Sequence, residues 1–198
     1  MKAGLMLGVN PEAKREANDF YATDPYVINR SIDFFKKIGL SNTVWECACG
    51  TGHLSKRLEE FGYQVYSSDL INRGYGSTMN FLEADHTKQG IDIITNPPFK
   101  MASEFVTHAM DILHKGQKLI LFLKIQFLET EKRMALFQRY GLKCVGVMSN
   151  RVCCAMNGEF DKYFKKDTNG AYRGGTQMYA WYVFEKGYKG ETTIDWIK

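Results

Sequence analysis

The sequence predicts an α/β fold in which a mostly parallel sheet is covered by helices on both faces. Apolar strand-like runs alternate with segments of helical period along most of the chain, and this alternation is typical of such sheets. Polar and glycine-containing turns directly follow several predicted strands, where ligands bind in these folds. With 198 residues, of which 44% are hydrophobic and 24% charged, the chain is long enough for one well-packed domain, which we expect to span residues 1–198.

The first elements form a helix followed by a strand, helix, strand unit. Residues 25–39 place apolar side chains on one helical face, and the glycine at their end favours a helix stop. Residues 43–48 have the pattern of a short buried strand, residues 53–62 that of a helix ended by glycine, and residues 63–70 that of a second strand.

The same alternation continues toward the carboxyl terminus, without an internal repeat or a low-complexity segment. Each predicted strand is short and apolar, and each predicted helix has one apolar face. We expect a third strand near residues 80–85, a strand over 91–95, a helix over 102–113, a strand over 118–125, a helix over 129–140, a strand over 142–149 and a final strand within 177–187.

Composition restricts the classes of function. The net charge of +4 and the pI of about 8.7 are compatible with a polyanionic partner but do not identify one. The cysteines are odd in number and form no Cys-x-x-Cys pair, so reduced thiols are expected instead of a zinc site or a disulfide framework. The four histidines have no ligand-like spacing, and no metal is expected. The cysteines are Cys47, Cys49, Cys144, Cys153 and Cys154.

No apolar run approaches the length of a membrane span, so no membrane partner is expected. The apolar stretch at residues 4–9 is too short for a signal-peptide core and is followed directly by polar and charged residues. We therefore expect a cytoplasmic protein.

A glycine turn follows the first predicted strand. In "ECACGTGHLS", Gly50 and Gly52 leave the backbone unencumbered between strand and helix, so a ligand can lie against it at the helix amino terminus. Asp69 ends the second strand, where a carboxylate can accept both hydroxyls of a ribose. The alternatives are a tight turn for the glycines and a helix or turn cap for Asp69.

The residues around this turn distinguish two classes of nucleotide-binding site. A dinucleotide fold would carry a third glycine at the position of Ser55. With Glu46 ahead of the turn, the segment resembles the first motif of class I methyltransferases that use S-adenosylmethionine (AdoMet), in which an acidic residue precedes a Gly-x-Gly loop that holds the amino-acid end of the cofactor. The Cys-Ala-Cys after Glu46 departs from the usual Pro-x-Ala spacer.

A second motif lies just after the fourth strand. "NPPF", Asn96 to Phe99, resembles the Asn-Pro-Pro-aromatic motif of the amino-group methyltransferases of the N6-adenine type. The resemblance implies a Rossmann-like class I methyltransferase, with a mostly parallel seven-stranded sheet, helices on both faces and an antiparallel last strand. It also implies AdoMet as the cofactor and DNA as the partner. Small bacterial and phage adenine methyltransferases resemble the chain most, which implies the cytoplasm of a bacterium or of a phage-infected host.

Two weaker matches complete the resemblance. "FYATDP" resembles the amino-terminal motif that precedes the glycine loop in the gamma-type ordering, which implies that Tyr21 and Thr23 touch the cofactor. Asp85, after the third strand, occupies the place of the acidic residue that binds the adenine of the cofactor. The alternatives are a packed aromatic ring for Tyr21, a helix cap for Thr23 and a turn cap for Asp85.

The chemistry gives a reason for the unusual strand end. An exocyclic amine on an aromatic base is a poor nucleophile, because its lone pair is delocalised into the ring. The side-chain oxygen of Asn96 and the carbonyl of Pro97 can each accept one N–H of the amine and direct the lone pair at the methyl sulfonium. Pro97 and Pro98 fix φ, and Phe99 offers a face on which a flipped-out base can stack. The alternative is a rigid structural loop.

A basic and aromatic segment occupies residues 151–177. Cations suited to phosphates alternate there with rings suited to unstacked bases, which favours a nucleic-acid surface over a solvated loop. The segment is short, and no separate target-recognition domain is present, so the sequence does not predict a recognised site. The predicted contacts are Arg151, Lys162, Lys165, Lys166 and Arg173.

These observations predict transfer of a methyl group to N6 of adenine in DNA. The same chemistry on adenine in RNA or on a protein glutamine amide uses a similar motif, although the aromatic residue in the glutamine enzymes is typically Tyr. A non-catalytic module on the same fold is a further alternative, and it has no need of both Asn96 and the glycine loop. The oligomeric state stays open.

Overall fold

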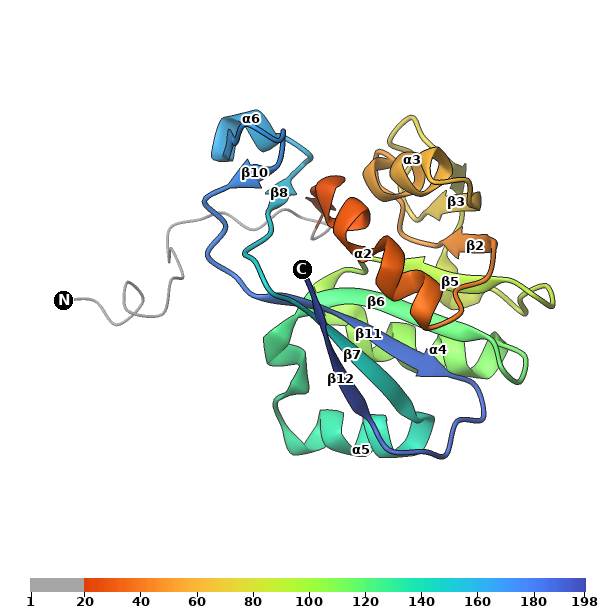
Figure 1. Cartoon of the computed structure of the whole chain (residues 1–198). Coiled ribbons are helices and arrows are strands. Elements are labelled where there is room, and N and C mark those ends of the chain that lie inside the picture. Colours follow the sequence, from red (N-terminus) through yellow and green to blue (C-terminus); the bar gives the residue numbers. More distant parts are fainter. Residues whose placement is uncertain (1–19) are drawn as a thin grey trace.

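A computed structural model of the chain describes residues 20–198, and its largest sheet has the strand order β12-β7-β11-β6-β5-β2-β3-β4. Helices cover both faces of this sheet (Figure 1). The apolar run at residues 4–9 lies outside the described range. The strands are β2 (Thr43–Glu46), β3 (Gln64–Asp69), β4 (Ser77–Thr78), β5 (Asp92–Thr95), β6 (Lys118–Lys124), β7 (Leu142–Met148), β11 (Tyr179–Glu185) and β12 (Thr193–Ile197).

The helices divide the core into two layers. Helices α2 (Tyr26–Lys37) and α3 (His53–Glu60) pack on one face of the sheet, where Phe35 and Leu58 are fully buried. Helices α4 (Ala102–Ile112) and α5 (Glu131–Tyr140) pack on the other face. Consecutive residues of the central strands β6 and β11 are apolar and buried. Because neighbouring residues in a strand point into opposite layers, both faces of the sheet are apolar.

The sheet topology confirms the predicted fold class. Strands β3, β2, β5 and β6 are parallel, and β11 lies antiparallel between β6 and β7. One strand is additional to the predicted seven. β12 pairs parallel to the outer side of β7, so the antiparallel strand β11 is the penultimate strand of the chain.

The predicted strand near residues 80–85 is wrong. The chain there forms a 3₁₀ turn at Phe81–Glu83, and the edge strand is the earlier β4. The Asn80 side chain accepts the Leu82 N–H at 3.1 Å and so caps the turn. Phe81 is buried against Trp45 and Phe105. The turn permits this burial without the alternating pattern of a strand.

The segment between β7 and β11 folds back over the carboxyl ends of the parallel strands. Within it, β8 (Cys154–Met156) pairs antiparallel with β1 (Tyr21–Thr23), from the other end of the described chain. A short helix, α6 (Phe160–Tyr163), and the hairpin β9 (Lys165–Lys166) and β10 (Tyr172–Arg173) complete the segment (Figure 1). This arrangement brings "FYATDP" next to the end of β5.

Two further properties concern residues 20–198 as a whole. In this part of the chain, no helix combines the length and the apolar character needed to cross a membrane. Nor does it contain a group of three or more His, Cys, Asp or Glu side chains able to hold a metal ion. All five cysteines are thiols without a disulfide partner.

Candidate active site

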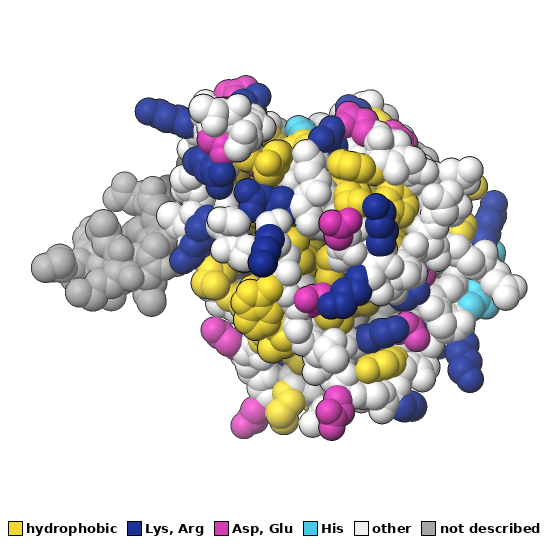
Figure 2. Space-filling model, in the orientation of Figure 1, with side chains coloured by type: hydrophobic (Ala, Val, Ile, Leu, Met, Phe, Trp, Pro, Cys, Tyr) yellow, Lys and Arg dark blue, Asp and Glu magenta, His cyan; other side chains and the backbone are white. Residues whose placement is uncertain are grey.

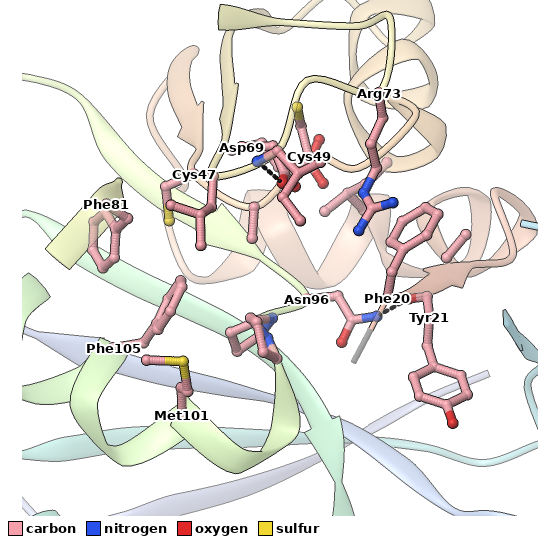
Figure 3. A pocket seen from close by; sticks show the side chains of 18 of the residues that line it. Phe20, Tyr21, Cys47, Cys49, Asp69, Arg73, Phe81, Asn96, Met101 and Phe105 are labelled. Atoms are coloured by element: carbon pink, nitrogen blue, oxygen red, sulfur yellow. Dashed lines mark hydrogen bonds between the residues drawn. The ribbon is translucent and has the colours of Figure 1, made fainter. Parts of the chain in front are cut away.

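A cavity lies at the carboxyl ends of β2, β3 and β5, as expected for this class of sheet. Figure 3 shows Phe81, Phe105 and Met101 along one side of it and Phe20, Tyr21 and Arg73 along the other, with Asn96 between them. The cavity therefore has an apolar end and a polar end. Among the predicted site residues, it brings together Tyr21, Thr23, Glu46, Asp69 and Asn96 to Phe99.

Asn96 has a fixed orientation. Its side-chain Nδ2 donates to the backbone carbonyl of Tyr21 at 2.8 Å and to the Thr23 hydroxyl at 3.0 Å. With both N–H groups used by these acceptors, Oδ1 is the atom left over, and it is buried without a hydrogen-bond partner among the described residues. A buried acceptor in this state is costly unless a ligand supplies a donor.

The residues after Asn96 turn the chain sharply out of the sheet. The Pro98 carbonyl accepts the N–H of Met101 at 2.9 Å, which begins a 3₁₀ turn over Phe99–Met101. The turn projects Phe99 toward Tyr21, and the two rings stack with their centroids 6.0 Å apart. Phe99 consequently forms a wall between the cavity and its neighbour described below.

The glycine loop forms a tight turn, but its surroundings differ from those expected. Gly50 and Gly52 adopt φ values of 57° and 80°, which favour glycine. A Cβ at Gly50 would lie 2.1 Å from the Phe20 ring, and one at Gly52 would lie 2.4 Å from the Tyr75 ring. The expectation that both glycines leave the backbone open to a ligand is therefore corrected: they make room for two aromatic rings, and the cavity is lined by residues 46–49 and by His53.

Asp69 is hydrogen-bonded to the backbone of the glycine loop. Its Oδ2 accepts the N–H of Gly50 at 2.8 Å, and its Oδ1 accepts the N–H of Ile71 at 2.9 Å. The carboxylate also lines the cavity, as a ribose-binding role requires. Asp69 therefore combines the predicted position with the turn-capping role that the sequence left as an alternative.

Glu46 is buried beneath the cavity. It is 2% exposed and shares a hydrogen bond with the Ser55 hydroxyl, which lies 2.7 Å from the Ser67 hydroxyl. Burial raises the pKa of Glu46 to about 8, so the carboxyl is mostly protonated at neutral pH. Ser55, which replaces the third glycine of a dinucleotide site, is thus the partner that satisfies this acid.

Asp85 does not reach the cavity. It is exposed and borders a separate surface depression together with Glu83 and His86. Because the 3₁₀ turn ends before Ala84, the residues that face the cavity are Asn80, Phe81 and Leu82. The structure therefore does not place Asp85 where an acidic residue could bind the adenine of a cofactor.

A second cavity adjoins the first and shares Tyr21 and Phe99 with it. Its aromatic walls also include Phe164 and Tyr179. Three cations line it as well, and the Nζ of one of them, Lys124, lies 5.2 Å from the centroid of the Phe99 ring. The three cations are Lys100, Lys124 and Arg133.

Sequence reasoning missed these cations because no local pattern joins them. Lys100 follows Phe99, Lys124 ends β6, and Arg133 lies on α5. Only the fold brings them to one cavity. The available signal was the position of Lys124 at the carboxyl end of an apolar strand, at the edge of the sheet where ligands bind.

Most predicted cations of the 151–177 segment already have partners. Lys162 pairs with Glu159 at 2.7 Å, Lys166 lies 3.8 Å from Asp161, and an Arg173 guanidinium nitrogen lies 2.5 Å from Asp167. Arg151 donates to the Thr176 carbonyl at 2.8 Å. All five cations, including Lys165, are exposed, and Figure 2 shows Lys and Arg side chains gathered over this part of the surface.

The rings of the same segment are partly structural. Phe160 is buried and stacks on Tyr172 with centroids 4.8 Å apart, and both pack in a small core with Ala22 and Ala155. Tyr163 is 42% exposed. The segment is therefore a folded cover whose outer surface carries cations, and only part of its aromatic content is accessible to a ligand.

Comparison with known proteins establishes the fold. The sequence matches no family model and no curated protein. Among solved structures, the chain is similar to a proposed RNA methyltransferase from Pyrococcus horikoshii, with a TM-score of 0.59, 12% identity and coverage of 88% of this chain and 90% of that one. It is also similar to a proposed class I S-adenosylmethionine-dependent methyltransferase from Listeria monocytogenes, with a TM-score of 0.57, 14% identity and coverage of 98% and 71%.

A third similar structure is the type IIG restriction endonuclease BpuSI, with a TM-score of 0.54, 11% identity and coverage of 85% of this chain and 26% of that one. Together these similarities show that the chain has the class I methyltransferase fold. At such low sequence identities these similarities show the fold alone, and the chemistry depends on the residues of the site.

Proposed function

We propose that this chain transfers the methyl group of AdoMet to the exocyclic N6 amine of adenine in DNA. The observation that carries the proposal is the state of Asn96. Tyr21 and Thr23 occupy its two N–H groups, and its Oδ1 is left buried and without a partner among the described residues. An amine that donates a hydrogen bond is the complement of such an oxygen.

The first cavity fits the proposed cofactor. AdoMet has a planar apolar adenine and a charged amino-acid end, and the cavity has an apolar end at Phe81 and Phe105 and a polar end at Arg73, with Asn96 between them. Asp69 would hold the ribose. When bound, the cofactor supplies an electrophilic methyl group on sulfur, and its loss from sulfur to the amine leaves a thioether and one proton to be released from nitrogen.

The residues of this chain orient the amine for that transfer. Asn96 Oδ1 would accept one N–H, and the carbonyl of Pro97, the next residue lining the cavity, would accept the other. With both N–H groups held in place, the nitrogen lone pair points away from the base plane and toward the methyl group. Placement of the reacting atoms is the main contribution, because the nitrogen becomes acidic only as it gains the methyl. No strong general base is needed.

The second cavity supports a nucleotide as the target. It adjoins Asn96 across the shared Tyr21 and Phe99, and its other walls include Tyr179. A flipped-out base can stack on these rings while the nearby cations Lys100, Lys124 and Arg133 contact its flanking phosphates. A neutral glutamine side chain has no use for three cations, so this cavity favours a nucleic acid over the protein amide. DNA is preferred to RNA on the resemblance of Asn96 to Phe99 to the N6-adenine enzymes.

The test is a methyl-transfer assay with radiolabelled AdoMet on unmethylated DNA, on RNA and on a protein extract. Labelled nucleic acid is digested to nucleosides, and wild type is compared with Asn96→Ala. We expect label in N6-methyladenine of DNA, loss of that label in Asn96→Ala, and AdoMet binding by both proteins in calorimetry. Label in RNA or protein would keep the chemistry and change the substrate.

A matched control separates Asn96 from damage to the fold. Asn29, on α2, is also a part-buried asparagine that accepts a hydrogen bond, from Arg57 at 2.6 Å, but it lies outside the first cavity. Asn29→Ala is expected to retain transfer. If wild type labels no substrate and binds no AdoMet, the enzyme hypothesis is refuted and a non-catalytic module on this fold is the better description.

A further inference from the structure

Arg73 occupies the polar end of the first cavity without an anionic partner. It lies in the loop after β3, four positions beyond Asp69, and Figure 3 shows its guanidinium pointing into the cavity. Its Nε is buried and has no hydrogen-bond partner among residues 20–198. Within the same residues, no Asp or Glu oxygen comes within ion-pair distance of it.

The nearest favourable contact of Arg73 is an aromatic face. The guanidinium carbon lies 4.3 Å from the centroid of the Phe20 ring. A cation–π contact leaves the in-plane N–H donors of a guanidinium unused, because they point away from the ring face. A buried N–H donor without an acceptor is costly, and the cost is removed when an anion enters.

The position of Arg73 identifies which part of a ligand it faces. Phe20 lies against Gly50, so the guanidinium over the Phe20 ring is on the side of the cavity that the glycine loop borders. The apolar side chains Phe81 and Phe105 are at the opposite side of the cavity. A ligand with a planar ring at the apolar side therefore presents its other end to Arg73.

We propose that Arg73 binds the α-carboxylate at the amino-acid end of AdoMet, an inference that rests on the function proposed above. A guanidinium presents parallel N–H donors in a fork that matches a carboxylate, and a buried pairing of this kind is strong and specific. Arg73 is thus a cofactor-binding residue outside both the glycine loop and the Asn-Pro-Pro-Phe motif. It gives the cavity a means of distinguishing the complete cofactor from adenosine compounds that lack a carboxylate.

The test compares two ligands that differ only in the carboxylate. Wild type, Arg73→Met and Arg73→Lys are titrated by calorimetry with AdoMet and with decarboxylated AdoMet, which keeps the sulfonium and the terminal amine. We expect wild type to bind AdoMet about 10- to 100-fold more tightly than the decarboxylated compound. Arg73→Met should lose that preference by weakening AdoMet binding alone, and Arg73→Lys should retain part of it.

A nearby cation provides the matched control. Lys56 lies on α3, the helix that follows the glycine loop, with its Nζ 4.8 Å from the centroid of the Tyr75 ring and outside the cavity. Lys56→Met should leave both affinities within about twofold of wild type, because a surface cation outside the site contributes little. Thermal melting of the ligand-free variants checks that each is folded.

Two results would overturn the assignment. Equal weakening of both ligands in Arg73→Met would mean that Arg73 shapes the cavity without contacting a carboxylate, and unchanged affinities would mean that it does not contact the cofactor. If wild type binds neither compound, the proposed function is refuted as well, so this failure is distinguishable from the other two.

Discussion

The side-chain amide of Asn96 donates a hydrogen bond to the Thr23 hydroxyl across 3.0 Å, which joins the residue after β5 to the first strand of the described chain. The backbone carbonyl of Tyr21 takes the other amide hydrogen at 2.8 Å. Tyr21 and Thr23, which the resemblance suggests as cofactor contacts, therefore orient Asn96, the predicted catalytic residue. This pairing determines which atom of Asn96 faces the cavity, and it leads to the first prediction.

Thr23→Val should slow methyl transfer without weakening cofactor binding. Valine has nearly the shape of threonine but cannot accept the Asn96 N–H, so the amide loses one of the two acceptors that hold its oxygen in place. We expect kcat to fall by about tenfold, the equivalent of about 1.4 kcal/mol, with little change in the Kd of AdoMet. Steady-state kinetics and calorimetry measure the two quantities. Thr23→Ser keeps the hydroxyl and should retain most of the rate; a similar fall in both variants would contradict the hydrogen-bonding role.

Glu46→Gln should change how stability depends on pH. The pKa of Glu46 is raised to about 8 from an ordinary value of 4.5, because the carboxyl is buried. At pH values between these two pKa values, the folded chain keeps a proton on Glu46 that the unfolded chain releases. The contribution of Glu46 to the free energy of unfolding therefore falls as pH rises. Relative to wild type, the glutamine variant should gain stability on the order of 3 kcal/mol from pH 5 to pH 8.

Urea unfolding followed by circular dichroism at the two pH values measures this difference for Glu46→Gln. Glutamine has nearly the same size and can still bond to the Ser55 hydroxyl, so cavity formation does not complicate the comparison. Glu83→Gln, at an exposed carboxyl, is the control and should show no such trend. Parallel pH profiles for wild type and Glu46→Gln would contradict protonation of Glu46 in the folded chain.

Lys124→Met should weaken nucleic-acid binding and reduce its dependence on salt. Lys124 lines the second cavity and is half-buried over the Phe99 ring, where it can meet a phosphate next to the target base. Loss of one phosphate contact should reduce the slope of log K against log salt concentration by about 1. Fluorescence anisotropy with a labelled adenine-containing oligonucleotide between low and physiological salt measures the slope.

Lys132 offers the comparison for Lys124. It is an exposed lysine on α5 that does not line the second cavity. Lys132→Met has the same change of charge and should leave the slope close to that of wild type. If both lysine variants shift the slope equally, the effect reflects the net charge of the surface and the second cavity has no special role.

Asp24→Ala should loosen the 151–177 segment. The buried Asp24 carboxylate accepts the N–H of Tyr26 at 3.0 Å and the N–H of Tyr172 at 3.1 Å, so it joins the start of α2 to β10. Loss of these bonds should release β10 from the body of the protein. Limited proteolysis with trypsin should then cut faster within residues 162–173, at least severalfold, because cleavage requires local opening.

Asp33 provides the control for Asp24. It lies on α2, the helix that follows Asp24, with a side chain 98% exposed and a weak surface contact to Lys36. Asp33→Ala should not change the cleavage pattern. Equal cleavage of Asp24→Ala and wild type would mean that the β1–β8 pairing and the small core around Phe160 hold the segment without Asp24.

Much of the fold could be predicted because its elements have a clear period. The helix at Tyr26–Lys37 and the strands at Thr43–Glu46 and Lys118–Lys124 lie where the apolar pattern places them. β12 was missed because it is an edge strand, in which Ile194 and Trp196 are 59% and 62% exposed, so its alternation does not mark a buried face. Phe81 was assigned to a strand because a local pattern does not show that Asn80 caps a turn there.

The candidate site was predictable where its residues are contiguous. Asn96 to Phe99 and the glycine loop can be recognised from short runs, and both line or border the cavity. Arg73, Lys124 and Arg133 are single cations on different elements, and only tertiary structure brings them to the cavities. Asp85 was placed in the site on the expectation that a strand ends before it, but the chain there forms a 3₁₀ turn and Asp85 is exposed outside the cavity.

The pairing of β1 with β8 determines when, during synthesis, the residues around Asn96 can take up their final arrangement. β1 emerges from the ribosome early, whereas Cys154–Met156, its partner, emerges only after six of the eight strands of the large sheet have been made. Until then Tyr21 and Thr23 lack the strand that positions them, and Asn96 lacks the acceptors that orient it. Contacts between such distant segments form late in folding. A nascent or prematurely ended chain therefore carries the Asn-Pro-Pro-Phe sequence without the geometry that would make it reactive.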